Sequence, residues 1–381
     1  MKILFVVNSA FTDANGLAAS CRRTVHYLRE AGEEVRLLSS RGNGKELPEY
    51  LLPDAKVPVF DKLIHTQGYN FAKADETVVR EAVRWADVVH LEEPFGMQRR
   101  VCRIVEEEKK PLTATCHLHP ENLFSSIHLR KDPLLNHSCM LLWRNQAFNR
   151  CSIIQCPTED VKERLEHWHF KPELRVISNG LPPAPPLLEV PAPKEDGSFT
   201  VVCTGRYSVE KDQLTLLRAM RYSRYADRIR LVLAGRGPQK KRLEKEAAKL
   251  VRQGVLQYPP VFSLYTPEGL RTLYAGADLY VHCALVEVEG LSCMEAIRTG
   301  LVPVIADAKL SAAAEFARSK ESIFRGGDPK QLAERIDYWL SDDGRRSREA
   351  ARYNDFGSEY DIRISVEKLR RMFRDAIEKA R

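Results

Sequence analysis

Short apolar runs alternate with amphipathic segments along the first half of the chain, and this rhythm constrains the fold most. The apolar runs have the length of buried strands, whereas Leu17–Ala31 has helical spacing and should end at Gly32. Strands and helices that alternate in this way form a parallel sheet through right-handed crossovers. The predicted strands are Ile3–Val7, Val35–Leu38, Val88–Leu91, Leu112–Cys116, Ile153–Cys156 and Arg175–Ser178.

A proline-dense stretch at 180–198 interrupts this rhythm. Its prolines are Pro182, Pro183, Pro185, Pro186, Pro191 and Pro193. Such density excludes a helix interior and a central strand, so we expect a linker. Beyond it the alternation restarts, with elements predicted at Thr200–Cys203, Leu214–Met220, Arg230–Ala234, Lys240–Val251, Val255–Gln257, Leu270–Tyr274, Asp278–His282, Leu291–Thr299 and Val302–Ile305.

The sequence therefore predicts an α/β protein with two Rossmann-like, doubly wound domains that face a cleft, which suits a length of 381 residues. The expected parts are an N-terminal domain, a linker, a C-terminal domain and a segment that packs back on the N-terminal domain, at 1–180, 181–198, 199–355 and 356–381. The last part contains a basic amphipathic helix, Ser365–Ala380. Ligands of such sheets bind beyond the carboxyl ends of the strands, so the residues after each strand are the candidates for function.

Charge and cysteine content narrow the class of protein. A net charge of +7 and a pI near 8.9 suit contact with nucleotide diphosphates or anionic lipid headgroups, and no nucleic-acid motif accompanies them. The first apolar run is too short for a signal peptide, and no stretch approaches the roughly 20 apolar residues of a membrane span, so any membrane contact should be peripheral. Nine cysteines without Cys-x-x-Cys spacing predict a reduced, cytoplasmic protein with no thiol metal site.

Two loops of the second half carry chemistry-bearing patterns. Gly205 ends the first strand there, and Arg206 and Lys211 follow on the same loop, where two cations suit a diphosphate. The alternative is ordinary surface charge beside a turn. After the next strand, Gly235 and Gly237 would let a base or a phosphate approach the backbone closely.

The third pattern places two glutamates eight residues apart around a glycine. Glu287 follows a predicted strand, Gly290 and Leu291 open the next helix, and Glu295 lies about one turn into that helix. Carboxylates accept hydrogen bonds from the hydroxyls of sugars and ribose, while amides at a helix start bind phosphate. The alternative is solvated glutamates near a helix start, where acidic residues are favoured.

Together these motifs resemble those of the family 4 (group 1) retaining glycosyltransferases, which have the GT-B fold. The resemblance rests on Gly205-Arg206…Glu210-Lys211, Gly235-Arg236-Gly237-Pro238, Glu287…Glu295 with Gly290, and Gly300–Ala306. It implies that Arg206 and Lys211 bind the donor diphosphate and stabilise the leaving group. It also implies that Glu287 holds the transferred sugar and Glu295 the ribose. It implies a nucleotide sugar as co-substrate, no metal and no other cofactor, and same-face attack that retains the anomeric configuration.

The resemblance assigns acceptor binding to the first domain. It places Gly16 near the donor phosphates and His117 beside the transferred sugar, although His117 could instead be a satisfied structural histidine. Glu92, His119 and Glu121 are further acceptor-side candidates, and the alternative for Glu92 is a charged turn.

Two features favour a lipid acceptor. His117–Asn122 resembles the His-x-x-Pro-Glu-Asn of bacterial diacylglycerol and related lipid glucosyltransferases, and Ala308–Ala312 resembles the same subgroup. Independently, Phe124–Arg150 has the composition of an interfacial helix, with a core-facing helix as the alternative. Its apolar and basic residues are Ile127, Leu129, Leu134, Leu135, Met140, Leu141, Leu142, Trp143 and Phe148, and Arg130, Lys131, Arg144 and Arg150; Lys62 and Lys73 would extend the basic face.

The leading hypothesis is an enzyme that transfers glucose or galactose from a UDP-sugar to a membrane lipid such as diacylglycerol, at the cytoplasmic face of an anionic membrane. The same chemistry on a polysaccharide or soluble acceptor is the first alternative, and GDP or ADP could replace UDP. A sugar-nucleotide epimerase and a non-catalytic sugar-nucleotide-binding module are alternatives of other classes. The leading hypothesis requires Arg206, Lys211, Glu287 and Glu295 to gather around one pocket.

Overall fold

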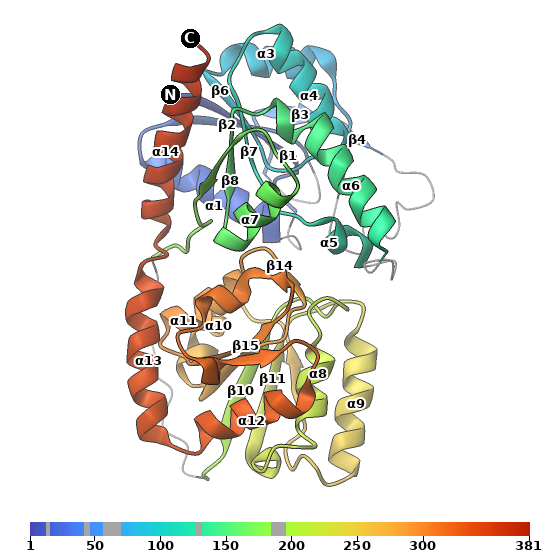
Figure 1. Ribbon diagram of the computed structural model, residues 1–381, viewed down its shortest axis with the longest axis vertical. Coiled ribbons are helices and arrows are strands. Elements are labelled where there is room, and N and C mark those ends of the chain that lie inside the picture. The colour runs from blue at the N-terminus through green and yellow to red at the C-terminus, as the bar shows by residue number, and fades with distance from the viewer. Residues whose placement is uncertain (13–15, 42–45, 56–69, 126–131, 184–195) are drawn as a thin grey trace. The chain divides into compact units, whose positions relative to one another are not determined.

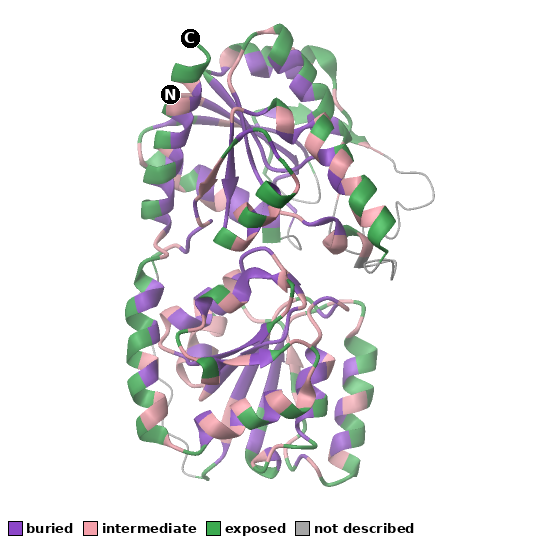
Figure 2. Ribbon diagram, viewed as in Figure 1, coloured by how far each residue is buried: buried purple, intermediate pink, exposed green. Residues whose placement is uncertain are grey.

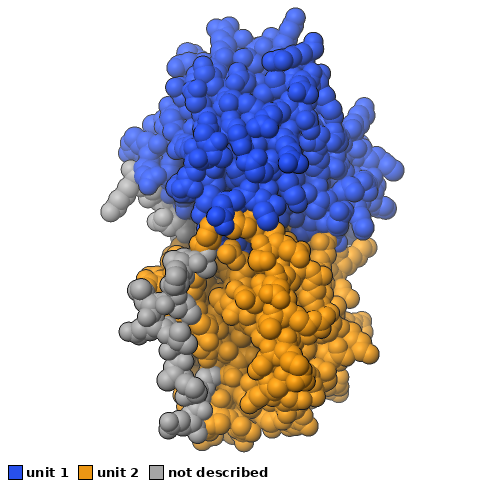
Figure 3. All heavy atoms as spheres, turned by 90° about the vertical axis from the view of Figure 1, so that its left-hand side faces the viewer, with its two compact units in different colours: residues 1–123, 129–182, 362–381 blue, residues 124–128, 183–361 orange. Residues whose placement is uncertain are grey.

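The computed structural model describes residues 1–12, 16–41, 46–55, 70–125, 132–183 and 196–381. It divides the chain into two compact units (Figure 3). Unit 1 comprises 1–123, 129–182 and 362–381, and unit 2 comprises 124–128 and 183–361. Each unit is a parallel sheet with helices around it, and the strands of both sheets are largely buried (Figures 1 and 2).

Unit 1 is built on a seven-stranded parallel sheet with the strand order β3-β2-β1-β6-β7-β8-β9. Its strands are β1 Lys2–Ser9, β2 Glu34–Ser40, β3 Tyr50–Leu52, β6 Val88–Leu91, β7 Leu112–Thr115, β8 Ile153–Cys156 and β9 Glu173–Val176, with a separate hairpin of β4 Asp54–Ala55 and β5 Phe71–Ala72. Its helices are α1 Gly16–Glu30, α3 Glu76–Trp85, α4 Gly96–Glu107, α5 Pro120–Ser125, α6 Pro133–Gln146, α7 Glu159–His167 and α14 Ile362–Lys379. The strand order reverses between β1 and β6, which makes their carboxyl ends the natural ligand position of such a sheet.

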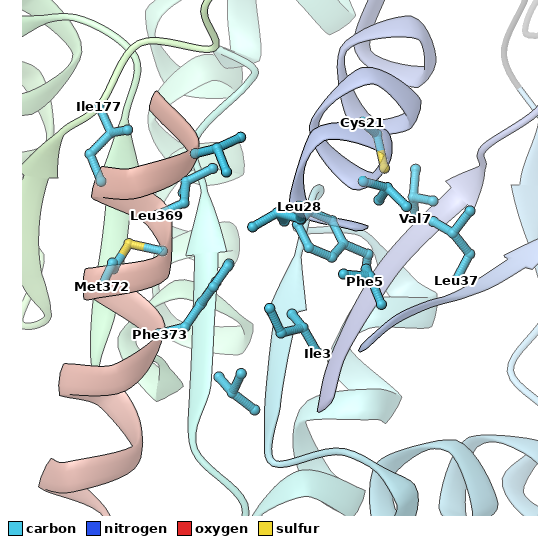
Figure 4. Packing of buried hydrophobic residues seen from close by; sticks show 14 of the residues in the cluster. Ile3, Phe5, Val7, Cys21, Leu28, Leu37, Ile177, Leu369, Met372 and Phe373 are labelled. Carbon is cyan, nitrogen blue, oxygen red and sulfur yellow. The ribbon is translucent and has the colours of Figure 1, made fainter. Parts of the chain in front are cut away.

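The last helix, α14, completes the core of unit 1. Its apolar residues recur at helical spacing, and Leu369, Met372 and Phe373 are buried in one cluster with Phe5 and Leu28 (Figure 4). The rings of Phe5 and Phe373 meet edge to face with centroids 6.2 Å apart. The basic residues of α14 therefore lie on its outer side, while its apolar stripe belongs to the same core as β1 and α1.

The chain enters and leaves unit 1 at one crowded point. Gly180 has φ of +66°, and a Cβ there would lie 2.6 Å from the Cα of Ile362. The amide of Ile362 donates to the carbonyl of Leu181 at 2.9 Å. A glycine is required here because it permits both the left-handed backbone and the close approach of the first turn of α14.

Unit 2 is built on a six-stranded parallel sheet of the doubly wound type, with the strand order β12-β11-β10-β13-β15-β17. Its strands are β10 Phe199–Thr204, β11 Ile229–Ala234, β12 Val261–Ser263, β13 Leu279–His282, β15 Pro303–Asp307 and β17 Ile323–Arg325, and the short strands β14 Val286–Glu287 and β16 Leu310–Ser311 pair separately. Its helices are α8 Gln213–Ala219, α9 Lys240–Arg252, α10 Pro267–Ala275, α11 Leu291–Arg298, α12 Pro329–Leu340 and α13 Asp343–Ser358.

Most predicted elements are present, and one is wrong. The strand predicted at Val255–Gln257 is the turn that ends α9, because the amide of Val255 donates back to Leu250 and Leu256 is buried beneath the helix end. The edge strand lies later, at β12. The strand predicted at Arg175–Ser178 begins two residues earlier as β9, and the linker prolines Pro185, Pro186, Pro191 and Pro193 lie outside the described residues.

The described helices include none that is long and apolar enough to cross a membrane. All nine cysteines are free thiols, and eight of them are buried in the two cores. Buried thiols in such positions pack as small apolar side chains.

Candidate functional site

Backbone hydrogen bonds join the first two motif loops of unit 2 into one surface. The amide of Gly205 donates to the carbonyl of Ala234 at 2.9 Å, and the amide of Tyr207 donates to the carbonyl of Arg236 at 2.9 Å. In return, the carbonyl of Tyr207 accepts from the amide of Gln239 at 2.9 Å. The loops that follow β10 and β11 thus hold each other in place at the carboxyl ends of neighbouring strands.

This loop contact explains two of the predicted glycines. A Cβ on Gly235 would lie 2.0 Å from the carbonyl oxygen of Gly205, and a Cβ on Gly237 would lie 2.5 Å from that of Tyr207. Gly237 also has φ of +156°. We predicted glycine at these positions because a ligand would approach the backbone closely. In the structure, the contact between the two loops alone is enough to require glycine there. Their contact with a donor stays a prediction.

The third motif contacts the same loop through one backbone bond and one ion pair. The amide of Leu285 donates to the carbonyl of Glu210 at 2.7 Å. The ammonium of Lys211 donates to Oε2 of Glu287, which is also 3.4 Å from Nε2 of His282. The two partners of the ion pair, Lys211 and Glu287, are only 22% and 16% exposed. Residues 76 positions apart therefore meet at one partly buried point.

Electrostatics keep Glu287 ionised. Burial alone would raise its pKa, but the charge and hydrogen bond of Lys211, together with the nearby ring of His282, hold the pKa well below its usual value. Burial lowers the pKa of His282, so that ring is neutral near neutral pH. The site thus presents one fixed anion beside one cation, a pair that can bind hydroxyl donors and phosphate oxygens respectively.

Arg206 is held on the same loop by a buried carboxylate. Its guanidinium donates to Oε1 of Glu210 at 2.7 Å, and Glu210 also accepts from the hydroxyl of Ser208 at 2.5 Å. The side chain of Glu210 is 4% exposed, whereas that of Arg206 is 39% exposed. The buried carboxylate of Glu210 therefore orients the guanidinium of Arg206, while part of the Arg206 side chain remains exposed to solvent.

Helix α11 positions the second glutamate of the pair. Gly290 precedes it with φ of +76°, and a Cβ there would lie 3.1 Å from the Cβ of Ala313, so the helix begins at Leu291 after a tight turn. Glu295 follows one turn later, and its charge adds to burial in raising the pKa of Tyr274. The hydroxyl of Tyr274 donates to Thr204 at 2.9 Å, directly before Gly205.

Unit 2 therefore brings the four predicted residues to the carboxyl ends of its central strands. Lys211 and Glu287 touch, Arg206 lies on the loop that carries Lys211, and Glu295 lies one turn into α11. Sequence analysis assigned no role to Ser208, His282 or Tyr274. The signal for His282 was present, since it is a polar residue at the end of an apolar strand that precedes a motif.

In unit 1, His117 and Glu92 form a second pair after neighbouring strands. Nε2 of His117 lies 2.7 Å from Oε2 of Glu92, and the two side chains are 9% and 3% exposed. The amide of Glu92 donates to the carbonyl of Val6 at 3.0 Å, which fixes its backbone against β1. Burial alone would raise the pKa of Glu92, but the neighbouring His117 and His90 hold it below its usual value.

The remaining candidates of unit 1 occupy different settings. Gly16 is the exposed first residue of α1. The side chain of His119 is fully buried, and its backbone carbonyl accepts from Asn122 as α5 begins. Glu121 lies in the first turn of α5 and is half-buried. Glu93, which follows Glu92, is buried and accepts from Asn8 and Gln98, so it is part of the fold.

Helix α6 leaves apolar side chains uncovered. Met140 and Trp143 are buried, but Leu134 is 79% exposed and Leu142 is 49% exposed. The predicted core-facing alternative therefore accounts for only part of this helix. Of the other predicted residues here, Arg144 donates to the carbonyl of Trp168, Lys73 is exposed, and Ile127, Leu129, Arg130, Lys131 and Lys62 lie outside the described residues.

Two family models match the chain. Residues 14–184 match the model described as Glycosyltransferase Family 4, and residues 189–356 match the model described as Glycosyl transferases group 1. The first match falls within the residues of unit 1 and its neighbouring segments, and the second covers the three motifs of unit 2.

Individual proteins are also similar. The alpha-monoglucosyldiacylglycerol synthase of Streptococcus pneumoniae is 26% identical over 326 residues, which cover 80% of this chain and 71% of that protein. The structure of Anabaena HepE with UDP and glucose is similar with a TM-score of 0.68 at 16% identity, over 98% of this chain and 100% of that one. The sucrose-phosphate synthase of Thermosynechococcus elongatus gives a TM-score of 0.72 at 13% identity, over the whole of both chains. These likenesses in structure establish the fold.

Proposed function

The chain belongs to the group 1 (family 4) glycosyltransferases and has their GT-B fold, and from this we propose that it transfers a hexose from a UDP-sugar to a membrane lipid. The observation that carries the donor half of the proposal is the partly buried pair of Lys211 and Glu287. A cation and a carboxylate at one point match the two chemical faces of a nucleotide sugar, which are its diphosphate and its hydroxyls.

Each donor-side residue takes one part of the nucleotide sugar in this proposal. Lys211 and Arg206 bind the diphosphate and stabilise the charge that develops on it as the sugar leaves. Glu287, kept ionised by its neighbours, accepts hydrogen bonds from sugar hydroxyls, and Glu295 accepts those of the ribose. The first amides of α11, near Gly290 and Leu291, face the phosphates.

The proposed reaction retains the anomeric configuration and uses no metal. The acceptor hydroxyl attacks the anomeric carbon on the face that the diphosphate leaves, and the departing phosphate oxygen takes the hydroxyl proton. Cationic side chains then supply the charge stabilisation that a metal ion would otherwise provide. Because the leaving group is also the base, its stabilisation is the main catalytic task.

UDP-glucose or UDP-galactose is the proposed donor, and diacylglycerol or a similar lipid is the proposed acceptor. HepE, which shares the fold, was crystallised with UDP and glucose. The pneumococcal relative is a glucosyldiacylglycerol synthase. The exposed leucines of α6 add a physical reason, since apolar side chains on a surface helix suit the interface of a bilayer. We place the enzyme at the cytoplasmic face of the membrane as a peripheral protein.

A donor and acceptor screen tests the proposal. The protein is incubated with UDP-glucose, UDP-galactose or GDP-glucose, together with vesicles that contain diacylglycerol, and the lipids are analysed by mass spectrometry. We expect a mass increase of one hexose on the lipid with a UDP-sugar. Transfer only to a soluble sugar would instead support the alternative acceptor. Interconversion of the sugar nucleotide without an acceptor would support an epimerase.

The membrane part of the proposal has its own test. Sedimentation with vesicles that contain anionic lipid should recover the wild-type protein in the pellet. Leu134→Asp together with Leu142→Asp should weaken this binding, because both side chains are exposed on α6. Leu264→Asp is the matched control, since Leu264 is 61% exposed in unit 2. Equal binding by both variants would remove α6 from the proposal.

A further inference from the structure

A chain of hydrogen bonds that crosses three strands lies next to the His117–Glu92 pair. Behind the pair, His90 on β6 is fully buried, and its Nε2 lies 3.5 Å from Oε1 of Glu92. The ring of His90 is also hydrogen-bonded to two threonines of β7, with Nδ1 at 2.9 Å from Thr113 and Nε2 at 2.8 Å from Thr115. The carboxylate of Glu92 thus lies between one histidine in the core and one near the surface.

The remaining bonds indicate which ring nitrogen of His90 carries the proton. The hydroxyl of Thr115 donates to Oε1 of Gln155 at 2.6 Å, and Nε2 of Gln155 donates to the carbonyl of Ile177 at 2.8 Å. Because Thr115 uses its proton on Gln155, it accepts from Nε2–H of His90. Burial lowers the pKa of His90 to about 4, so this ring is neutral and its Nδ1 accepts from Thr113.

Because His90 is neutral and donates its Nε2–H to Thr115, the side-chain hydrogen bond of the Glu92 carboxylate is the one with His117. Glu92 can only accept hydrogen bonds, so Nε2 of His117 must carry the proton between them. Its other nitrogen, Nδ1, is then the ring atom that remains for a ligand. In the neutral ring Nδ1 is an acceptor, which selects a hydroxyl as its partner.

We propose that Glu92 is a positioning residue for His117: it accepts the hydrogen bond from Nε2–H and so leaves Nδ1 as the acceptor for a substrate hydroxyl. This inference rests on the proposed function, and it replaces the prediction that Glu92 binds the acceptor itself. The network of Thr113, Thr115 and Gln155 fixes the ring of His90, whose Nε2 lies 3.5 Å from Oε1 of Glu92. Glu92 therefore acts on substrate only through the imidazole.

A double-mutant cycle on hexose transfer tests this dependence. Glu92→Gln keeps the shape of the side chain but removes its charge, and we expect kcat/KM to fall roughly 10- to 100-fold, the range found for outer partners of metal-bound histidines. His117→Gln keeps a donor near the Nε2 position but lacks Nδ1, and should lower kcat/KM at least as much. In the His117→Gln background, Glu92→Gln should cause no further loss. A full second loss in that background would show that Glu92 contacts substrate directly and would overturn the inference.

Glu93→Gln is the matched control, since Glu93 is the adjacent buried carboxylate and is bonded to Asn8 and Gln98. Its effect on kcat/KM, whatever its size, should be the same with and without His117→Gln. The same cycle is then measured on denaturant unfolding, which needs no activity. Coupling of Glu92 and His117 in unfolding, with no transfer by the wild-type protein to any acceptor, would refute the proposed function and support the pairing. Absence of coupling in both measurements would refute the pairing.

Discussion

Units 1 and 2 each present a cation-forming side chain paired with a carboxylate after adjacent strands, but the two pairs differ in kind. In unit 2 the partners are Lys211 and Glu287, 22% and 16% exposed. In unit 1 they are His117 and Glu92, 9% and 3% exposed. Lysine is charged at any physiological pH, whereas a histidine changes its charge within that range. The first pair therefore suits a permanently charged ligand such as a diphosphate.

The residues that surround the two carboxylates, Glu287 and Glu92, also differ. Glu287 receives Lys211 on a loop that other loops hold through backbone bonds, so the ammonium can turn toward a ligand on its flexible stem. Glu92 lies 2.7 Å from Nε2 of His117 and 3.5 Å from Nε2 of His90, and the ring of His90 is itself hydrogen-bonded to Thr113 and Thr115. In the proposed function, unit 2 supplies the charge that stabilises the leaving diphosphate and unit 1 supplies the imidazole that binds a substrate hydroxyl, a division that mutations can test.

The largest effect should follow from Lys211→Ala. Loss of the ammonium removes stabilisation of the leaving diphosphate, and we expect kcat/KM for the donor to fall roughly 10³-fold. Steady-state kinetics with a UDP-sugar measure this, and Lys241→Ala on the exposed face of α9 is the control. If His117→Ala proved far more damaging than Lys211→Ala, the assignment of charge supply to unit 2 would be wrong.

The second-largest effect should be that of low pH, which we expect to destabilise unit 1 more than unit 2. Burial lowers the pKa of His90 from 6.5 to about 4. Between these two pH values the ring is protonated in the unfolded chain but neutral in the folded protein. The stability that His90 contributes is complete above pH 6.5 and is lost as the pH falls toward 4, by about 3 kcal/mol for that difference in pKa. His282 in unit 2 has the same sign of shift, but Glu287 beside it opposes the effect of burial.

Hydrogen exchange between pH 7 and pH 4.5, corrected for intrinsic rates, measures this difference. Peptides of β6–β8 should lose more protection than peptides of β10–β13. His90→Gln should flatten the pH dependence of unit 1 alone. Earlier opening of unit 2 would reverse the comparison and point to His282 as the dominant group.

The fold could be predicted from the sequence, whereas the contacts within the candidate sites could be predicted only in part. Apolar periodicity located most strands because burial sets the pattern, and it failed at Val255–Gln257 because the turn after α9 buries apolar side chains just as a strand does. Arg206, Lys211 and Glu287 were selected because they follow strands, and Glu295 because of its spacing from Glu287; their roles stay predictions. Glu92 was selected because it follows a strand, but its pairing with His117 was not predicted, because the two residues follow different strands and no local pattern reveals that contact.

Gly235→Ala tests the tight packing of loops that sets unit 2 apart. The added Cβ would lie 2.0 Å from the carbonyl oxygen of Gly205, so the two loops must separate. We expect a loss of about 1–3 kcal/mol in unfolding free energy, as for other overpacked sites, together with weaker donor binding. Gly96→Ala is the control, because no described atom lies within 4 Å of the Cβ position there. Unchanged donor affinity would show that the loops can move apart without disturbing Lys211.

Gly16→Ala should have the smallest effect on the fold and therefore tests ligand approach most cleanly. No described atom lies within 4 Å of a Cβ at Gly16, the first residue of α1, and alanine suits a helix better than glycine. Unfolding free energy should change by less than about 0.5 kcal/mol. If donor phosphates approach this backbone as predicted, the methyl group should raise KM for the donor several-fold with little change in kcat. An unchanged KM would remove Gly16 from the donor site and leave donor binding to unit 2 alone, which would make the division between the units sharper than proposed.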